Sequence, residues 1–407
     1  MNNQRLVVID GVRTPFCKAG TELATLGADE LGRIAVDALL TRTGFDPALI
    51  DEVIFGCVSQ PPEAANVARV IALRAGVPES VPAVTVHRNC ASGFEAFTAA
   101  YERMAAGRGS IFLVGGTESM SRVPLLFRDE TARKLATFAK SKTARHKLTA
   151  LSDFRPADFT PRVGLKLGLT DPFSGLNMGE TAELLAREGN ITRTAQDAFA
   201  IRSHERALEA EARLADEICP VYLGEKPITR DNGPRSDQTP SVLAGLKPVF
   251  DKYGSVTAGN SSQITDGAVA MLVATEERAA ALGFKPLGAL TGYAYAGCDP
   301  SRMGLGPVHA IDRAAKITGL MPADADLVEI NEAFAAQVLA VLQRVPIADD
   351  KLNVNGGSIA LGHPVGATGA RLILTSLHEL ARRNARRALV TLCVGGGQGG
   401  AIWLERI

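Results

Sequence analysis

A cysteine, Cys90, stands where a short apolar strand is expected to turn into a helix. Residues 84–86 are β-branched and predict a buried strand, and the apolar residues of 94–104 recur at helical spacing. A helix start offers unpaired N–H groups and the positive end of the helix dipole, so this position favours the thiolate, the nucleophilic form of cysteine. Taken alone, the pattern fits a catalytic nucleophile and equally a buried structural cysteine.

Three polar residues of the second half stand among glycines or at the ends of expected strands. Asn331 follows an apolar strand expected at 326–330, and α/β proteins gather their sites at the carboxyl ends of strands. His363 lies in the stretch NGGSIALGHPVGATG, and Cys393 ends another expected strand. Singly, the glycine-rich stretch also fits a phosphate loop, although it lacks the lysine of GxxxxGK[ST], and His363 also fits a hydrogen-bonded core residue.

The composition is that of a neutral α/β chain. Its 407 residues can form more than one core, and 44 basic against 44 acidic side chains leave no net charge to attract nucleic acid. Six scattered cysteines without a CxxC pair fit neither a disulfide framework nor a zinc site, so we expect no bound metal. The chain starts directly on a strand expected at 6–9 and lacks a long apolar run, so we expect a cytoplasmic protein.

The sequence contains a hidden repeat. Expected strands alternate with expected helices throughout, which indicates a mostly parallel sheet with helices on its faces. The segment GFDPALIDEVIFG, residues 44–56, is similar in sequence to GLMPADADLVEIN, residues 319–331. A strand that runs into consecutive glycines also recurs, as SIFLVGGTE and as ALVTLCVGGGQG, and Cys90 before one helix is answered by His363 before another. We therefore predict two related α/β halves.

The two halves differ by a long insertion. The strand that follows the consecutive glycines comes at once in the second half, but only at 268–273 in the first. We therefore predict three parts: an N-terminal half of residues 1–121 plus 250–275, an inserted loop domain of 122–249, and a C-terminal half of 276–407.

The opening of the insertion, residues 122–166, is basic although the chain as a whole is neutral. It holds eleven basic and four acidic residues, a net of +7, and Leu135, Phe138 and Ala139 mark one apolar side of a helix. The segment fits a solvated helical hairpin, and equally a docking surface for a partner, an acidic ligand or a membrane.

Taken together, these segments resemble the thiolase family. VHRNCASG, NEAFAAQ, NVNGGSIALGHPVGATGAR and CVGGGQGGA correspond to the family's four signature blocks in its order, and TAGNSSQITDGA and MGETAE match further family segments. The resemblance spans nearly the whole chain. It implies an α/β protein with a duplicated αβαβα layered fold, an inserted loop domain, and a homodimer or homotetramer.

The resemblance also implies roles for the polar residues. Cys90 would be the nucleophile that takes the acyl group as a thioester, and Cys393 the general acid and base. His363 and Asn331 would shape one oxyanion hole, the asparagine usually through a bound water. The N–H groups of Cys90 and Gly395 would form the second.

Further residues are implied to bind the substrates, which are coenzyme A and acyl-CoA, with no permanently bound cofactor. Ser262 matches a serine near the pantetheine, and Arg235 would lie by the adenine. Met178 would line the acyl end of the pocket, and Ala333 and Phe334 of the second block belong to the same binding region.

The activity implied is the cleavage of 3-ketoacyl-CoA by coenzyme A in fatty-acid β-oxidation. A biosynthetic acetoacetyl-CoA thiolase, which condenses two acetyl-CoA, is the alternative within the family. Ketoacyl synthases share the doubled fold, but their usual Cys-His-His or Cys-His-Asn site does not match Cys393. A non-catalytic acyl-CoA or lipid-binding relative is disfavoured by the intact Cys90 and His363.

Two departures set this chain between subfamilies. Asn177 stands where many short-chain biosynthetic thiolases carry a histidine. Residues 122–176 instead look like those of the thiolase subunit of fatty-acid oxidation complexes, which implies a partner subunit with hydratase and dehydrogenase activities, or an anionic membrane, as the occupant of 122–166. That subunit typically has His-Glu-Ala-Phe where this chain has Asn331 and Glu332, so the acyl chain length is not predicted.

Overall fold

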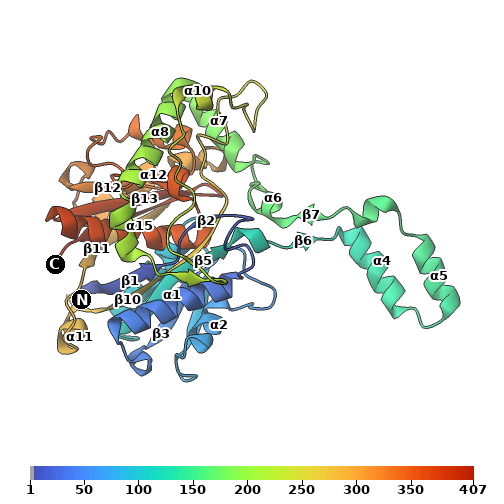
Figure 1. The fold of residues 1–407 in the computed structure, drawn as a ribbon, viewed down its shortest axis with the longest axis horizontal. Helices are drawn as coiled ribbons and strands as arrows, with labels where there is room; N and C mark the ends of the chain where they lie inside the picture. Colours follow the sequence, from blue (N-terminus) through green and yellow to red (C-terminus); the bar gives the residue numbers. More distant parts are fainter. Residues whose placement is uncertain (1–3) are drawn as a thin grey trace. The chain divides into compact units, whose positions relative to one another are not determined.

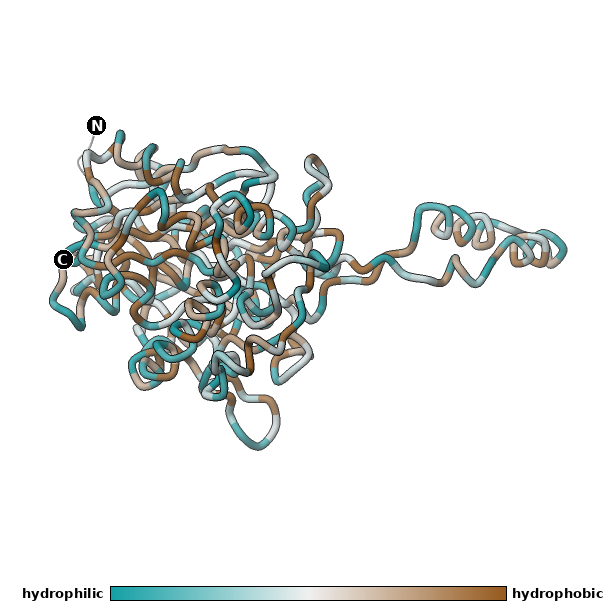
Figure 2. The backbone as a smooth tube through the Cα atoms, turned by 90° about the horizontal axis from the view of Figure 1, so that it is seen from above, coloured by the Kyte–Doolittle hydropathy of each residue, from teal (hydrophilic) through white to brown (hydrophobic). Residues whose placement is uncertain are grey.

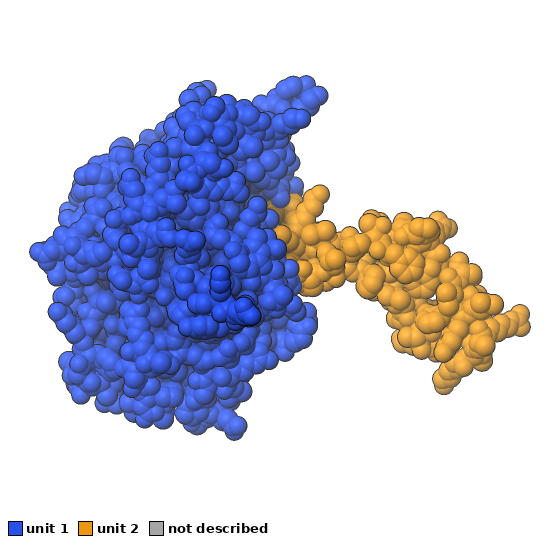
Figure 3. Space-filling view, in the orientation of Figure 1, with its two compact units in different colours: residues 1–122, 171–407 blue, residues 123–170 orange. Residues whose placement is uncertain are grey.

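The computed structural model describes residues 4–407, which form two compact units. The body contains residues 4–122 and 171–407, and residues 123–170 form the second unit (Figure 3). Among the described residues, no helix is long and apolar enough to cross a membrane.

Ten strands of the described chain form the central sheet of the body (Figure 1). Their order is β12 (Leu327–Ile330), β13 (Arg387–Val394), β14 (Gln398–Glu405), β11 (Gly288–Gly297), β1 (Leu6–Arg13), β10 (Thr265–Thr275), β5 (Ile111–Ser119), β3 (Glu52–Gly56) and β4 (Ala83–Val86), with β2 (Cys17–Lys18) paired to β10. The pairs β3–β4, β3–β5 and β12–β13 are parallel, whereas β5–β10, β10–β1, β13–β14 and β14–β11 are antiparallel. A short antiparallel pairing of β1 with β11 joins the two halves.

The main helices of the body are α1 (Ala28–Thr43), α2 (Val67–Arg74), α3 (Ser92–Ala105), α7 (Met178–Glu188), α8 (Arg193–Glu209), α12 (Gly306–Thr318), α13 (Ala335–Leu342) and α15 (Val365–Arg383). Shorter ones are α9 (Glu211–Leu214), α10 (Pro240–Ala244), α11 (Glu276–Ala281) and α14 (Ser358–Leu361).

The helices form three layers. One half of the sheet lies between the first and second layers, and the other half lies between the second and third. One core joins α3 and α15 to inward-facing strand residues and includes Phe97, Leu377 and Val390. Leu31 belongs to a second core under α1 and α2, and Ile311 to a third under α12 and α13. In Figure 2 much of the hydrophobic colour lies in the interior of the body. This arrangement confirms the predicted duplicated αβαβα fold.

The duplication extends to single turns and hydrogen bonds. α1 and α12 both end on a glycine in the left-handed region, Gly44 with φ 61° and Gly319 with φ 73°. Asp51 accepts hydrogen bonds from two successive N–H groups where the chain enters β5, and Asp326 accepts two where the chain enters β13. Each pair of residues is related by the repeat offset found in the sequence, which confirms the predicted repeat.

The insertion after β5 divides between the units. Residues 171–249 belong to the body, where Leu185 of α7 shares a core with Cys393 and Ala333. Residues 123–170 alone form the second unit. The predicted division into residues 1–121 plus 250–275, 122–249 and 276–407 therefore stays a prediction.

The second unit contains very little buried surface. It consists of β6 (Leu125–Leu126) paired with β7 (Arg162–Val163), and the helices α4 (Asp129–Lys140), α5 (Ala144–Ser152) and α6 (Gly164–Gly168). Of residues 123–170, only Thr131, Ala150 and Asp158 are buried. Lys134 Nζ lies 2.7 Å from Asp158 Oδ2 and ties α4 to the turn after α5.

Candidate active site

Glycines let α3 and α15 approach closely at their first turns. A Cβ on Gly93 would lie 2.5 Å from the backbone nitrogen of Ala370, and one on Gly369 would lie 2.6 Å from that of Phe94. A side chain at either position would therefore push the helices apart. Because Cys90 directly precedes α3 and His363 directly precedes α15, this contact brings the two halves' predicted catalytic segments together.

Cys90 is held in a tight turn before α3. The N–H of Ala91 donates to the carbonyl of Arg88 over 2.9 Å, and that of Ser92 donates to the carbonyl of Asn89 over 3.0 Å. Burial raises the pKa of the Cys90 thiol, although its own N–H and that of Gly395 favour the thiolate. The expectation that the helix start would favour the thiolate is thus outweighed by desolvation.

Cys393 and Gly395 come from the end of β13. The Cys393 side chain is buried, and burial together with the neighbouring Cys90 raises the pKa of its thiol well above the ordinary value. Cys393 is therefore a neutral thiol at neutral pH and has a proton to give. Gly395 begins the turn into β14, and its N–H lowers the pKa of the Cys90 thiol.

His363 lies between α14 and α15 with its ring fixed on both sides. Its Nδ1 is 2.6 Å from Thr368 Oγ1, and its Nε2 is 3.4 Å from Asn331 Nδ2. Burial, reinforced by the charge of Arg371, lowers the pKa of His363 to about 4. The ring is therefore neutral at neutral pH.

Asn331 follows β12 and is fully buried. Its N–H donates to the carbonyl of Thr391 over 3.0 Å, and its Oδ1 accepts the hydroxyl hydrogen of Ser358 over 2.6 Å. Because Oδ1 is occupied in this way, the amide nitrogen is the atom turned to His363. Two nitrogen atoms that can donate hydrogen bonds therefore stand side by side.

Sequence reasoning missed three side chains that hold the site. Ser358 and Thr368 orient Asn331 and His363, and only their places in the glycine-rich block signalled them. Glu118, at the end of β5, accepts from the N–H groups of Val58, Ser59 and Gly366 over 2.8–3.0 Å. Burial raises the pKa of Glu118 to about 7 despite these donors. It ties the start of α15 to the first half.

The residues assigned to substrate binding lie partly around the same site. Met178 Sδ is 3.4 Å from where a Cβ on Gly395 would stand, so this side chain covers the glycine turn. Ala333 and Phe334 share a core with Met178 and Cys393. The N–H of Ser262 donates to the carbonyl of Ala333 over 3.0 Å, which puts this serine beside them.

The contacts made by the segment around Arg235 do not connect it to the other residues assigned to substrate binding. Its side chain is exposed, and its N–H donates to His204 Nδ1 over 3.1 Å. Burial and then the charge of Arg235 lower the pKa of His204 to about 4. A role for Arg235 at the adenine stays a prediction.

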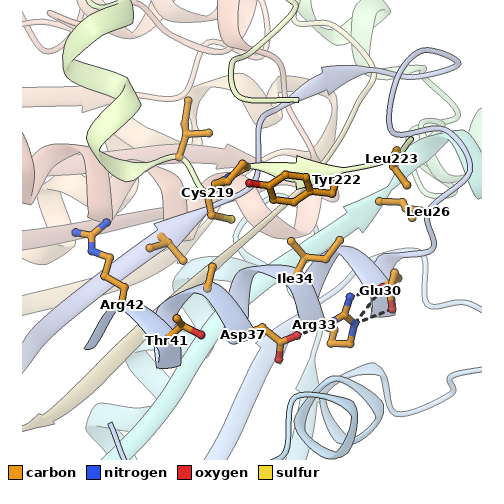
Figure 4. Close-up of a pocket in the computed structure, with 14 residues that line it drawn as sticks. Leu26, Glu30, Arg33, Ile34, Asp37, Thr41, Arg42, Cys219, Tyr222 and Leu223 are labelled. Atoms are coloured by element: carbon orange, nitrogen blue, oxygen red, sulfur yellow. Dashed lines mark hydrogen bonds and ion pairs between the residues drawn. The ribbon is translucent and has the colours of Figure 1, made fainter. Parts of the chain in front are cut away.

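A cavity of about 570 Å³ lies elsewhere in the body, between α1 and residues 218–223 (Figure 4). Ile34 and Arg33 of α1 and the ring of Tyr222 belong to its wall. None of the site residues predicted from the sequence lines it, so it is separate from the site built around Cys90. Within residues 4–407, no cluster of three or more His, Cys, Asp or Glu side chains could hold a metal ion.

The geometry assembles the elements of acyl transfer through a cysteine. One sulfur, Cys90, faces a backbone N–H donor, and a second sulfur, Cys393, holds a proton nearby. His363 and Asn331 add two nitrogen donors that could stabilise a negative oxygen. Such a set can bind an acyl group covalently, stabilise an oxyanion and move a proton.

Family descriptions match both halves of this fold. Residues 6–277 match the description "Thiolase, N-terminal domain", and residues 284–406 match "Thiolase, C-terminal domain". The chain belongs to the thiolase family, whose acyltransferases use coenzyme A substrates.

Individual relatives carry two kinds of name. The chain is 40% identical to an acetyl-CoA acetyltransferase of Allochromatium vinosum, with 100% of both chains covered, and 40% identical to a 3-ketoacyl-CoA thiolase of Bacillus subtilis, with 97% of both covered. It is also similar to the crystal structure of human mitochondrial 3-ketoacyl-CoA thiolase in complex with CoA, at a TM-score of 0.90 and 36% identity over 99% of this chain and 98% of that one. These names include both degradative and biosynthetic enzymes, so they do not distinguish the two activities for this chain.

Proposed function

We propose that this protein cleaves 3-ketoacyl-CoA with coenzyme A, giving acetyl-CoA and a shortened acyl-CoA, as in fatty-acid β-oxidation. The observation that carries the proposal is that the residue before Cys90 bonds to the glycine turn after Cys393, where Asn89 Nδ2 donates to the carbonyl of Gly395 over 2.7 Å. The N–H of Gly395 faces the Cys90 sulfur, and Cys90 in turn raises the pKa of Cys393. A ketone cleavage through a thioester needs one sulfur as nucleophile and a second group to carry a proton.

Cys90 first gives its thiol proton to water, and in the first half-reaction its thiolate attacks the ketone carbon of the substrate and forms a tetrahedral alkoxide. The carbon–carbon bond then breaks, its electron pair passes into the enolate of acetyl-CoA, and the acyl group stays on sulfur as a thioester. The enolate carbon takes the proton of Cys393. In the second half-reaction the Cys393 thiolate removes the thiol proton of coenzyme A, which attacks the thioester and releases the Cys90 thiolate.

Two sets of donors stabilise the negative oxygens of these steps. The N–H groups of Cys90 and Gly395 serve the alkoxide. The mechanism requires the neutral His363 ring to carry its proton on Nε2, which the Thr368 hydroxyl supports when it turns from the Pro364 carbonyl, 3.0 Å away, to His363 Nδ1, 2.6 Å away. That N–H and the amide of Asn331 then converge on the enolate oxygen, where each well-placed donor contributes ~3–4 kcal/mol to the transition state.

Mass spectrometry after brief incubation with an acyl-CoA tests the nucleophile. The acyl group should lie on Cys90, and Cys90→Ser should fold normally while losing nearly all turnover. Cys17→Ser is the matched control, because Cys17 is a buried cysteine that pairs in β2 and lies outside the site. An acyl group found on any other cysteine would contradict the assignment.

The direction and the chain length are proposals that one assay separates. Thiolysis is measured across 3-ketoacyl-CoA substrates from short to long chains, beside the condensation of two acetyl-CoA. Activity on 3-ketoacyl-CoA longer than acetoacetyl-CoA would support the degradative proposal. Activity restricted to acetoacetyl-CoA would favour the biosynthetic alternative.

We further propose that the second unit docks on an anionic lipid bilayer. It has ten basic and four acidic residues. It also contributes nine of the 21 exposed large apolar side chains found in the described chain, including Leu148 of α5 and Phe159. Exposed apolar side chains among lysines and arginines are typical of helices that lie in a membrane interface. The alternative is that the second unit binds an acidic partner protein.

Liposome sedimentation tests the bilayer. Charge reversal of Lys140, Lys142 and Lys147 should weaken binding to vesicles that contain phosphatidylserine, and more so at low salt. Lys134 is left in place because it pairs with Asp158. Reversal of three exposed basic residues of the body, Arg108, Lys226 and Lys285, is the control. Unchanged vesicle binding would exclude the bilayer, and a loss of short-chain turnover would instead indicate a lid over the acyl pocket.

We also propose a homodimer, formed where β4 ends the sheet. Ala83–Val86 are half-buried on this edge strand, so its outward backbone groups can pair with a second copy. The carbonyl of Pro82 accepts from Val53 of β3 and that of Ala83 accepts from Asn66 Nδ2, so the N–H of Ala83 is the group that points outward. Ala83→Pro should therefore leave the fold intact and give a monomer by light scattering. An unchanged dimer would place the contact elsewhere.

The cytoplasmic location stays a prediction.

A further inference from the structure

Asn89 has an unusual backbone for a residue that is neither a glycine nor at a helix end. It lies in the left-handed region with φ 43°, directly before Cys90. Among residues 4–407, three other non-glycine residues have positive φ, and all are asparagines as well: Asn190, Asn353 and Asn384. Asparagine tolerates this region better than most residues, but the conformation still costs energy, which surrounding contacts must offset.

The Asn89 side chain reaches across the molecule to the other half. Its Nδ2 donates to the carbonyl of Gly395 over 2.7 Å, the short end of the usual range. The nitrogen also lies 3.8 Å from where a Cβ on Gly396 would stand, so the amide rests against both glycines. No periodicity or motif links two residues that are 306 positions apart.

The same glycine also acts on Cys90, because its N–H favours the thiolate and so lowers the pKa of that thiol. Two successive residues of one half therefore hold the two sides of a single glycine of the other half. Asn89 donates a hydrogen bond to the carbonyl of Gly395, and Cys90 interacts with the N–H of Gly395. A restraint of this kind is needed, because the turn contains three glycines, and Gly396 and Gly397 have φ of 87° and 79°. A run of glycines has more backbone freedom than any other sequence.

We propose that Asn89 is a positioning residue that clamps the Gly395 turn to the nucleophile, so that the Gly395 N–H stays directed at the Cys90 sulfur and at the oxygen of an acyl group bound to it. The second part of this inference rests on the proposed function. The first part concerns the free protein alone. Asn89 touches neither the sulfur nor the substrate in this role and acts through Gly395.

The clamp requires an N–H donor at this position. Asn89→Asp has the same shape and tolerates the same backbone, but it turns an oxygen toward the Gly395 carbonyl. Asn89→Gly keeps the left-handed backbone without strain and removes the donor. Asn190→Gly is the matched control, because Asn190 has φ 49°, is exposed and lies after α7, away from the site.

Two measurements separate positioning from folding. The first is the pH dependence of Cys90 alkylation by iodoacetamide, followed by peptide mass spectrometry. When the Gly395 N–H is no longer held against the sulfur, the thiolate loses a hydrogen bond, so the alkylation midpoint should move up by ~0.5–1 pH unit in both Asn89 variants. The second is the single-turnover rate of Cys90 acylation, which should fall ~3–10-fold with little change in KM. Asn190→Gly should change neither.

The outcomes distinguish the inference from the proposed function. Alkylation needs no acyl substrate, so it tests the clamp even if the protein fails to take an acyl group. An alkylation midpoint that is the same in wild type, Asn89→Gly and Asn190→Gly would overturn the clamp. A lower melting temperature in Asn89→Gly without a shifted midpoint would also overturn it and leave Asn89 a structural residue.

Discussion

Lowering the pH tests how His363 is held in the folded protein. Its ring is buried, and its pKa is lowered from 6.5 to about 4. Between these values the unfolded chain protonates this histidine and the folded chain does not. The unfolded state therefore binds one more proton, and the free energy of unfolding falls as the pH falls.

The size of the effect follows from the shift. Each unit of pKa corresponds to about 1.4 kcal/mol, so the full difference from 6.5 to about 4 amounts to roughly 3.4 kcal/mol, of which roughly 2 kcal/mol is lost by pH 5. This is a large part of the ~5–15 kcal/mol that holds a typical domain folded. The stability is fully present above pH 6.5 and disappears as the pH approaches 4.

Urea unfolding of wild type and His363→Gln at several pH values between 7.5 and 5 measures the effect. Their difference in unfolding free energy should shrink by roughly 2 kcal/mol toward pH 5, because the variant lacks the titrating group. His204→Gln should show the same trend, since the pKa of His204 is also lowered to about 4. A His363 difference that stays constant over this range would mean that the ring titrates as in the unfolded chain, and the neutral donor proposed here would lose its basis.

Two further substitutions address the second cysteine and the fold. Cys393→Ala should still allow Cys90 to be acylated but reduce complete turnover by ~10²–10⁴-fold, since no group remains to protonate the enolate; loss of acylation as well would indicate a structural role. Asp231→Ala should cost ~2–3 kcal/mol in urea unfolding, because it removes a carboxylate 2.7 Å from the buried Arg13 guanidinium and leaves Glu217 as its remaining partner. Glu211→Gln, in an exposed ion pair, should cost at most ~1 kcal/mol, and equal losses would contradict the reasoning.

The sequence predicted those parts of the fold that local patterns control. α1 follows such a pattern, because its apolar face repeats at helical spacing and Gly44 stops the helix in the left-handed region. The repeat was visible because both halves keep this glycine and the apolar strand after it. The four polar segments lie at the ends of strands or starts of helices, and the layered fold brings such ends together.

What the sequence could not predict depends on contacts between distant segments. The bond from Asn89 to Gly395 joins the segment before α3 to the turn after β13, 306 residues away in the chain. The helix start after Cys90 was expected to favour the thiolate, whereas burial raises the pKa of the Cys90 thiol, and burial is set by the whole fold. The roles assigned to the site residues stay predictions until the variants above are measured.

The second unit raises a separate question of stability, because three buried residues cannot offset the entropy of ordering 123–170, at ~1–2 kcal/mol per residue. Contacts beyond those within the unit must supply the rest, which is why an occupant such as a bilayer is expected. The unit can be removed cleanly, since Leu126 pairs with Arg162 across β6 and β7.

Replacing residues 127–161 by Asn-Gly closes that pair as a two-residue hairpin. None of the body's core clusters includes a residue of the deleted segment, so the variant should unfold at nearly the wild-type urea concentration and Cys90 should still be acylated. Binding to phosphatidylserine vesicles should disappear. If the variant instead aggregates or loses acylation, the segment supports the body, and the surface of α4 and α5 has a different task from docking.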